Sequence, residues 1–169
     1  MHERAAEFVD RAVARYDVAV DVTEFPEGTK TAAEAADAVD CDVAQIASSI
    51  VIGLSGTGPT STADDGPPAD LVVAVTSGAN RVDLDAVADY FDASSASMAD
   101  ADRIREVVGW SIGGVPPICH ETALPTVLDP TLTEYDTVWA AAGTPSAMWS
   151  VAPERLRELA DSTVVDLTE

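Results

Sequence analysis

The chain has 169 residues, of which 47% are hydrophobic, and its 30 acidic residues against nine lysines and arginines give a formal net charge of −21. This hydrophobic content can fill a core, so the composition excludes an intrinsically disordered chain despite the high charge. The length is typical of one domain, and we expect residues 1–169 to form a single domain.

The acidic residues are spread along the whole sequence rather than gathered in one tail. They have two explanations: an acidic face that binds a basic partner, or a surface adapted to the molar salt of a halophile's cytoplasm. The even spread, together with Ala- and Val-rich apolar segments that contain few large aromatics, favours the halophile explanation. Net charge of this size bears on solubility and association, and it does not determine the fold.

The two cysteines, Cys41 and Cys119, form neither a CxxC motif nor a metal-ligand spacing. We therefore expect no metal site and no disulfide framework, although one disulfide between them remains open. We expect neither a signal nor a transit peptide, and the sequence has no apolar stretch long enough to cross a membrane. We expect a cytoplasmic protein without a cofactor, a membrane partner or a DNA partner.

The amino-terminal part of the chain carries one helix signal and one strand signal. Apolar residues at helical spacing predict an amphipathic helix over residues 3–16. The positions that predict it are Ala6, Val9, Val13 and Tyr16. Valines that alternate with other residues then predict a strand over residues 18–22.

Two capping-box patterns follow. Thr31 with Glu34 three residues later predicts a helix that ends at about Val39, and Asp42 with Gln45 predicts a second short helix that ends at about Ser48. An apolar strand is predicted over residues 50–54. Residues 55–69 are rich in Gly, Ser, Thr and Pro, which predicts the flexible loop of an extended hairpin that leads to a strand over residues 71–76.

The rest of the chain alternates less regularly. Asp83 and Asp100 are the predicted N-caps of helices over residues 84–91 and 101–108, and Gly109 is placed to end the second helix. The later predicted elements are strands over residues 126–128, 137–141, 147–151 and 163–167 and a helix over residues 153–160. Strands outnumber what a strict βαβ alternation needs, which predicts an α/β (α+β) fold with helices packed on a mixed sheet.

Two glycine- and proline-rich turns are the most informative local features. The first contains Gly113, Gly114, Pro116 and Pro117, and the second is the segment Ala142-Gly143-Thr144-Pro145. Glycine lets the backbone approach a ligand closely, and proline stiffens the loop. Such loops can present bare N–H groups to a carbonyl or an oxyanion. On this chemistry alone, two ordinary sheet turns are the better explanation.

The order of these segments resembles the YbaK/prolyl-tRNA-synthetase-associated domain family, from about Phe25 to Asp166. The segments that carry the resemblance are TAAEAADAV (31–39), AQIASSIVI (44–52), LVVAVTSGANRVDL (71–84), GWSIGGVPPICH (109–120), TVLDPTL (126–132) and VWAAAGTPSAMWSVAPERL (138–156). The resemblance implies a mixed, partly barrel-like sheet surrounded by helices. It also implies an aminoacyl-tRNA deacylase, which in this family acts as a free protein or as an editing insert.

The resemblance implies that Gly113–Pro117 corresponds to the family's Gly-x-x-x-Pro loop, which lies against the aminoacyl group at the CCA end of the tRNA. Glycine N–H groups in this loop can bind the ester carbonyl and its developing oxyanion. We therefore predict catalytic roles for Gly113 and Gly114. The predicted substrate-binding residues are Thr31, Val115, Pro117, Asp129, Gly143 and Ser146.

One position departs from the family pattern. The family typically has a lysine where this chain has Ser48, and that lysine is thought to position the substrate near its terminal ribose and phosphate. A serine hydroxyl brings no charge. Because the family's attacking water is activated with help from the tRNA 2′-OH, hydrolysis can survive this loss at a cost on the order of 10²–10³ in rate. We keep Ser48 as a predicted catalytic residue.

The remaining candidates each have a structural alternative. His120, a candidate general base, can instead make a structural hydrogen bond, and Asp129 can simply hold a turn before Pro130. Near Ser146 the family often has a histidine. Arg81 could touch phosphate, although an ion pair at a helix start explains it better. The tryptophans Trp110, Trp139 and Trp149 could stack on adenine but more often belong to a core.

Three functional hypotheses follow. The leading one is hydrolysis of mischarged aminoacyl-tRNA that carries a small amino acid such as Ala, Ser or Cys. The second is a non-catalytic relative that binds the aminoacyl or RNA end, and Ser48 favours it. The third is an interaction module for an aminoacyl-tRNA synthetase, which only the acidic surface supports. The expected partners are the CCA end of aminoacyl-tRNA and a synthetase, and the expected assembly is a monomer or a homodimer.

Overall fold

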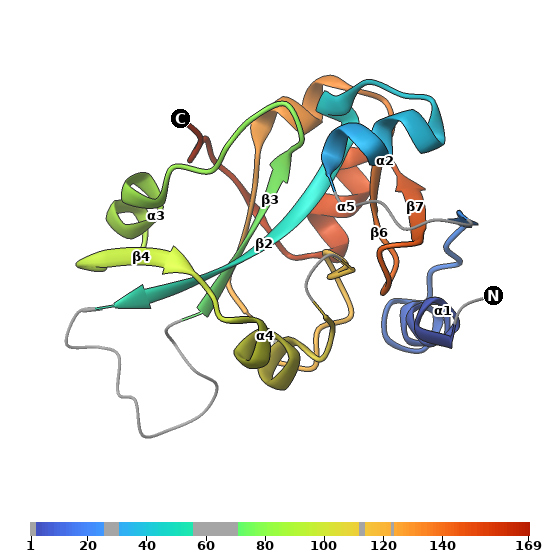
Figure 1. The fold of residues 1–169 in the computed structure, drawn as a ribbon, viewed down its shortest axis with the longest axis horizontal. Helices are drawn as coiled ribbons and strands as arrows, with labels where there is room; N and C mark the ends of the chain where they lie inside the picture. The colour runs from blue at the N-terminus through green and yellow to red at the C-terminus, as the bar shows by residue number, and fades with distance from the viewer. Residues whose placement is uncertain (1–2, 26–30, 56–70, 112–113, 123) are drawn as a thin grey trace.

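A computed structural model describes residues 3–25, 31–55, 71–111, 114–122 and 124–169 (Figure 1). Within these residues one mixed sheet has eight strands, in the order β1-β7-β6-β2-β3-β5-β8, with β4 paired to β2 outside this path. The strands are β1 (Val22–Glu24), β2 (Ile46–Ser55), β3 (Leu71–Ser77), β4 (Ser95–Met98), β5 (Thr126–Leu128), β6 (Val138–Ala141), β7 (Ala147–Val151) and β8 (Thr163–Val164).

The long strand β2 organises the sheet. It pairs antiparallel with β3 along one edge, from Ala47 opposite Ser77 to Gly53 opposite Leu71. On its other edge it pairs with two different strands, parallel with β6 near its start and antiparallel with β4 near its end. All seven residues of β3 are buried, so β3 is covered on both faces, as its continuous apolar sequence indicates.

Five α-helices and two 3₁₀-helices surround the sheet in the part of the chain that the structure describes. They are α1 (Glu3–Tyr16), α2 (Ala32–Val39), η1 (Val43–Gln45), α3 (Leu84–Tyr90), α4 (Ala101–Val108), η2 (Pro130–Glu134) and α5 (Pro153–Leu159). The largest buried cluster joins α1, α4 and one face of the sheet, and a second cluster lies under α3 on the other face. This arrangement confirms the predicted fold class.

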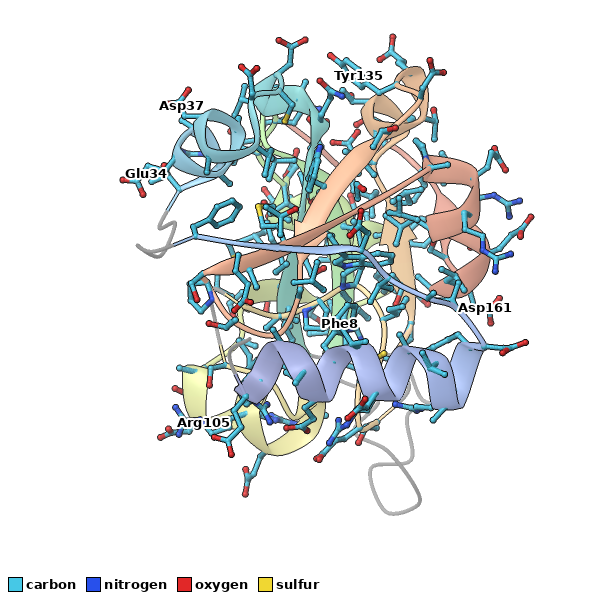
Figure 2. The ribbon with its side chains drawn as sticks, turned by 90° about the vertical axis from the view of Figure 1, so that its right-hand side faces the viewer. Phe8, Glu34, Asp37, Arg105, Tyr135 and Asp161 are labelled. Atoms are coloured by element: carbon cyan, nitrogen blue, oxygen red, sulfur yellow. The ribbon has the colours of Figure 1, made fainter. Side chains whose placement is uncertain are left out.

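Helix α1 lies along one side of the molecule, and Figure 2 shows Phe8 pointing from it toward the sheet. The ring of Phe8 lies 6.3 Å from that of Trp110 and 5.5 Å from that of Trp149, measured between ring centroids. Trp110 and Trp149 are therefore core residues and offer no stacking face to a base, which corrects one of the two alternatives drawn from the sequence.

The capping predictions are confirmed at Thr31 and Asp83. The Thr31 side chain accepts a hydrogen bond from the Glu34 amide, and the Asp83 side chain accepts from Asp85 and Ala86 at the start of α3. Gly109 ends α4 in the left-handed conformation, with φ of 88°. Strands β5 and β7 have the predicted bounds.

Several predicted boundaries were wrong. The second capping box opens only the short 3₁₀-helix η1, and β2 begins directly after it at Ile46, so Ser48 lies in a strand rather than at a helix end. The strand predicted over residues 18–22 pairs only from Val22 to Glu24. Strand β4 was not predicted because its residues are small and mostly exposed. Apart from Ser55, the predicted loop 55–69 lies outside the described residues.

The buried face of α1 also differs from the prediction. Ala5, Phe8 and Ala12 are buried, whereas Val13 is 49% exposed. The helix turns Phe8 inward because the two tryptophans offer an aromatic contact there, and this contact is invisible in the local spacing. No helix in the described part of the chain is long and apolar enough to cross a membrane.

Candidate functional site

The candidate site lies at a gap along one edge of β2. The parallel pairing with β6 covers only Ile46 and Ala47. The pairing with β4 begins further on, where the amide of Ala99 donates to the carbonyl of Val51 over 3.0 Å. Between these two points no strand of the described residues borders this edge of β2 at Ser49. The sheet is therefore open at Ser48 and Ser49.

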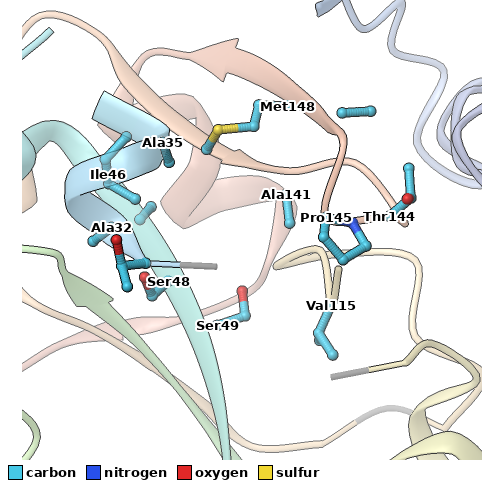
Figure 3. Close-up of a pocket in the computed structure, with 13 residues that line it drawn as sticks. Ala32, Ala35, Ile46, Ser48, Ser49, Val115, Ala141, Thr144, Pro145 and Met148 are labelled. Atoms are coloured by element: carbon cyan, nitrogen blue, oxygen red, sulfur yellow. The ribbon is translucent and has the colours of Figure 1, made fainter. Parts of the chain in front are cut away.

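A pocket of about 210 Å³ lies at this gap (Figure 3). It is lined by residues of α2 with its cap, β2, the loop after α4, and the end of β6 through the start of β7. These residues are Thr31, Ala32, Ala35, Ile46, Ala47, Ser48, Ser49, Val115, Ala141, Thr144, Pro145, Ala147 and Met148. Most of them are small, so the pocket has the width for a small ligand group.

The two glycine-containing turns form one wall of the pocket. The amide of Gly143 donates a hydrogen bond of 3.0 Å to the carbonyl of Gly114, which joins the turns through their backbones. A Cβ added at Gly114 would lie 2.6 Å from the Cα of Thr144. Glycine at position 114 is therefore required for close backbone packing, and this packing places Val115 beside Thr144 and Pro145 on the wall.

Helix α1 supports this wall from behind. Gly143 has a φ of 95°, and a Cβ there would lie 2.7 Å from the Trp110 ring and 2.8 Å from the Arg4 carbonyl. The guanidinium carbons of Arg4 and Arg11 lie 4.2 and 5.2 Å from the centroid of the Trp110 ring, within the range of cation–π attraction. Arg4 also donates to the carbonyl of Gly109. These contacts fix the turn that carries Thr144 and Pro145.

The polar groups of the pocket are hydroxyls. Thr31, Ser48, Ser49 and Thr144 supply them, and no charged side chain lines the pocket among the described residues. The Thr144 hydroxyl lies 3.3 Å from that of Ser146, which does not itself line the pocket. Such a pocket suits a neutral group and offers hydrogen bonds from hydroxyls. It contains no carboxylate or imidazole that could act as a base within the described residues.

His120 lies away from this pocket. Its Nε2 is 2.7 Å from the carbonyl oxygen of Pro116, so this nitrogen carries the proton and donates it. Burial lowers the pKa of His120, the Pro116 bond opposes this shift, and Arg15 adds to it. The neutral imidazole thus holds the 116–120 loop. It lines a separate cavity of about 500 Å³ together with Pro117, Arg15 and Tyr16.

The neighbouring Cys119 is also a structural residue. It is buried with a φ of 67°, and its carbonyl accepts a hydrogen bond of 2.9 Å from Trp110 Nε1. Burial raises the pKa of its thiol to about 11, although Arg15 and Arg11 act in the opposite direction. The thiol therefore stays protonated near neutral pH and is a poor nucleophile. Both Cys41 and Cys119 are free cysteines.

Asp129 also lies outside the pocket and holds a loop. It is the one buried acidic residue in the described part of the chain. Its carboxylate accepts hydrogen bonds from the Ser77 amide at 3.0 Å, the Asn80 side chain at 2.9 Å and the Thr131 amide at 2.9 Å. It therefore connects the end of β3 with the start of η2. No group of three or more His, Cys, Asp or Glu within the described residues is arranged to hold a metal ion.

The structure thus separates the predicted site residues into three groups. Thr31, Ser48 and Val115 line one pocket. Gly114 and Gly143 lie in the turns of its wall, and Ser146 lies beside Thr144 without lining the pocket. The predicted role of the Gly114 N–H was wrong, because this N–H donates to the carbonyl of Ser111 over 3.0 Å. Pro117, His120 and Asp129 lie elsewhere, and Gly113 falls outside the described residues.

Sequence reasoning missed part of the pocket. Ser49 was not singled out because the predicted strand began only at residue 50, and the structure brings both Ser48 and Ser49 to one pocket. Thr144 and Pro145 could have been found, because they directly follow Gly143 in a turn that was already singled out. The alanines on α2, β6 and β7 carry no local signal of a pocket.

Comparison with known proteins identifies relatives of this chain. A sequence model described as the aminoacyl-tRNA editing domain matches residues 26–159. The uncharacterized protein YwhH of Bacillus subtilis (strain 168) is 28% identical over 146 residues, which cover 85% of this chain and 83% of YwhH.

Solved structures have the same fold. The crystal structure of a candidate trans-editing enzyme for prolyl tRNA synthetase has a TM-score of 0.86 and 34% identity, and the match covers 100% of this chain and 99% of that one. The hypothetical protein APE2540 has a TM-score of 0.78 and 20% identity over 96% of this chain and 99% of its own. At this lower identity the likeness concerns the fold alone.

Proposed function

The chain belongs to the aminoacyl-tRNA editing domain family, and we propose that it is a trans-editing enzyme that hydrolyses the ester bond of mischarged aminoacyl-tRNA. Its proposed substrates carry small amino acids such as alanine, serine or cysteine. The observation that carries this proposal is that Ser48 and Val115, from two segments far apart in the sequence, line one small pocket.

The size of the pocket supports the choice of small amino acids. Five of its lining residues are alanines, among them Ala32, Ala141 and Ala147, and its volume is about 210 Å³. The pocket wall excludes a large aminoacyl side chain by steric clash. This exclusion is far stronger than the discrimination a pocket achieves against a ligand that is smaller by one methylene group. The absence of lining charges among the described residues also disfavours aminoacyl groups with charged side chains.

The chemistry that this pocket supports relies on positioning. A water oxygen attacks the ester carbonyl carbon, the carbonyl oxygen becomes an oxyanion, and the bond to the ribose oxygen then breaks as that oxygen takes up a proton. No described pocket residue can remove the water proton, so the adjacent 2′-OH of the terminal ribose assists. Hydroxyls of the pocket such as that of Ser48 stabilise the oxyanion, because the Gly114 N–H already donates to the carbonyl of Ser111.

The partner in this proposal is the CCA end of an aminoacyl-tRNA, and a synthetase is a second proposed partner. All described acidic residues except Asp129 lie at least partly at the surface, so the protein repels RNA at low salt. Near 1 M salt the Debye length falls to about 3 Å, and local contacts then decide binding.

A second candidate function is binding without turnover. Ser48 occupies the position at which the family typically has a lysine, and it supplies a hydroxyl without a charge. In this alternative the pocket retains the aminoacyl end, and the ester is hydrolysed no faster than in solution.

A deacylation assay in molar KCl tests the proposal. Wild-type protein is incubated with tRNAs that carry alanine, serine, cysteine, proline or a large amino acid, and the remaining ester is measured over time. The proposed enzyme accelerates loss of at least one small amino acid and spares the large one. If every ester decays at its spontaneous rate while the tRNAs bind, the binding function replaces the enzymatic one.

A further inference from the structure

We infer that the hydroxyl of Ser49 selects a hydroxyl-bearing aminoacyl side chain, so that seryl esters are favoured over alanyl esters. This inference rests on the proposed function and deepens it. It begins from one property of the pocket: Ser49 Oγ is buried and has no hydrogen-bond partner among the described residues.

Such an atom is unusual in this molecule. Only one other buried side-chain polar atom lacks a partner in the described part of the chain, the Nε1 of Trp149, which lies in the core. Buried hydroxyls are normally paired, because an unpaired one has lost its water without gaining a replacement. A polar atom of this kind in the wall of a pocket is a ready partner for a polar group of the ligand.

Ser49 lies beside the gap in the sheet. On this edge of β2, pairing with β6 ends at Ala47 and contact with the segment after β4 begins at Val51. Ser49 therefore stands in the gap. Figure 3 shows its hydroxyl directed away from β2 toward the wall that bears Ala141 and Pro145.

The burial of this hydroxyl indicates which part of the substrate it meets. The ester and the ribose are attached to the rest of the tRNA, so they occupy the mouth of the pocket. The aminoacyl side chain is the free end of the ligand and reaches the buried wall. A serine side chain can place its own hydroxyl there and exchange a hydrogen bond with Ser49, whereas an alanine methyl group leaves Ser49 Oγ unpaired.

The experiment compares two substrates on two variants in molar KCl. Seryl and alanyl esters are prepared on the same tRNA, and single-turnover deacylation is measured with wild type, Ser49→Ala and Ser48→Ala. A second readout needs no turnover: calorimetric binding of adenosines that carry seryl or alanyl groups through a non-hydrolysable 3′-amide bond. We expect wild type to prefer the seryl substrate and the seryl amide by about tenfold, as one hydrogen bond allows.

Ser49→Ala is expected to lose this preference in both readouts and to melt no lower than wild type, because the hydroxyl makes no bond inside the protein. Ser48→Ala is expected to change both substrates equally. The inference is overturned if Ser49→Ala slows both substrates equally, if it leaves the preference intact, or if it lowers the melting temperature. If wild type hydrolyses neither ester but its amide preference depends on Ser49, the proposed function fails while this inference stands.

Discussion

The amide of Gly143 donates a 3.0 Å hydrogen bond to the carbonyl of Gly114, and this single bond joins the two turns that form one wall of the pocket. Residues 114 and 143 are 29 positions apart in the sequence, and neither turn alone makes a site. The bond places Val115 beside Thr144 and Pro145, opposite the two serines of β2 (Figure 3).

Replacing Gly114 by alanine tests this wall. The new Cβ would lie 2.6 Å from Thr144 Cα and 2.7 Å from Thr144 N, which are backbone atoms that cannot turn aside. We expect Gly114→Ala to lower the free energy of unfolding by about 1–3 kcal/mol. We also expect deacylation to fall at least about tenfold, because the wall moves.

Gly53→Ala is the matched control for this variant. A Cβ there has only ordinary contacts, the nearest at 3.8 and 3.9 Å. Chemical unfolding and single-turnover assays of both variants check the prediction. Equal stability and equal rates in the two variants would show that the turns do not need to approach so closely.

His120 is expected to control stability rather than catalysis. Burial lowers its pKa in the folded state, so between its folded pKa and the ordinary value of about 6.5 the unfolded chain binds more protons. The contribution of His120 to the free energy of unfolding is fully present above about pH 6.5. It is lost as the pH falls, with a slope of up to about 1.4 kcal/mol per pH unit.

The measurement is unfolding of wild type and His120→Gln from pH 8 to pH 5 in molar KCl. Wild type should lose more stability than His120→Gln over this range, because glutamine does not titrate. Parallel curves would mean that His120 is not kept neutral by the fold.

Restoring a lysine tests the role of Ser48. In Ser48→Lys an ammonium group enters a pocket whose described lining residues carry no charge, beside the expected position of the ribose and phosphate. A charge-assisted hydrogen bond is about twice as strong as a neutral one, so we expect faster deacylation of a small mischarged amino acid, with a gain that shrinks as salt increases. A slower Ser48→Lys enzyme would show that this chain holds its substrate differently.

The acidic surface predicts salt-dependent folding. Apart from Asp129, the described carboxylates lie at or near the surface, and their mutual repulsion is relieved when salt screens it. We expect the melting temperature to rise steadily from dilute buffer to molar KCl. A melting temperature that does not change with KCl would contradict the halophile explanation of the charge.

The ends of helices could be predicted from the sequence, whereas the pairing of strands that are distant in the sequence could not. Thr31 and Asp83 mark helix starts through side-chain caps, and Gly109 marks a helix end. These signals depend on a few neighbouring residues only. The start of β2 was predicted several residues too late. The capping box at Asp42 forms, but the helix it opens ends at Gln45 and β2 begins at Ile46.

The site was predictable only in part for the same reason. Ser48 and Val115 stand in recognisable segments, and the pocket brings them together. His120 and Asp129 carry reactive groups, but both groups hold loops in the structure. The His120 imidazole donates to the carbonyl of Pro116, and the Asp129 carboxylate accepts from the amides of Ser77 and Thr131. Ser49 became a pocket residue only because β6 and β4 leave a gap beside it, which no local pattern encodes.

The central claim is that the pocket between β2 and the two turns holds the aminoacyl group during hydrolysis, and a pair of neighbouring substitutions on α2 tests it most directly. Ala32 lines the pocket, whereas Ala33 is exposed and is not among the lining residues. Single-turnover deacylation of a small mischarged amino acid is measured for Ala32→Leu and Ala33→Leu in molar KCl, with melting temperatures as a check on folding. We predict that Ala32→Leu slows deacylation at least about tenfold by filling the pocket while Ala33→Leu matches wild type. Equal, fast rates in both variants would contradict the claim that this pocket is the site.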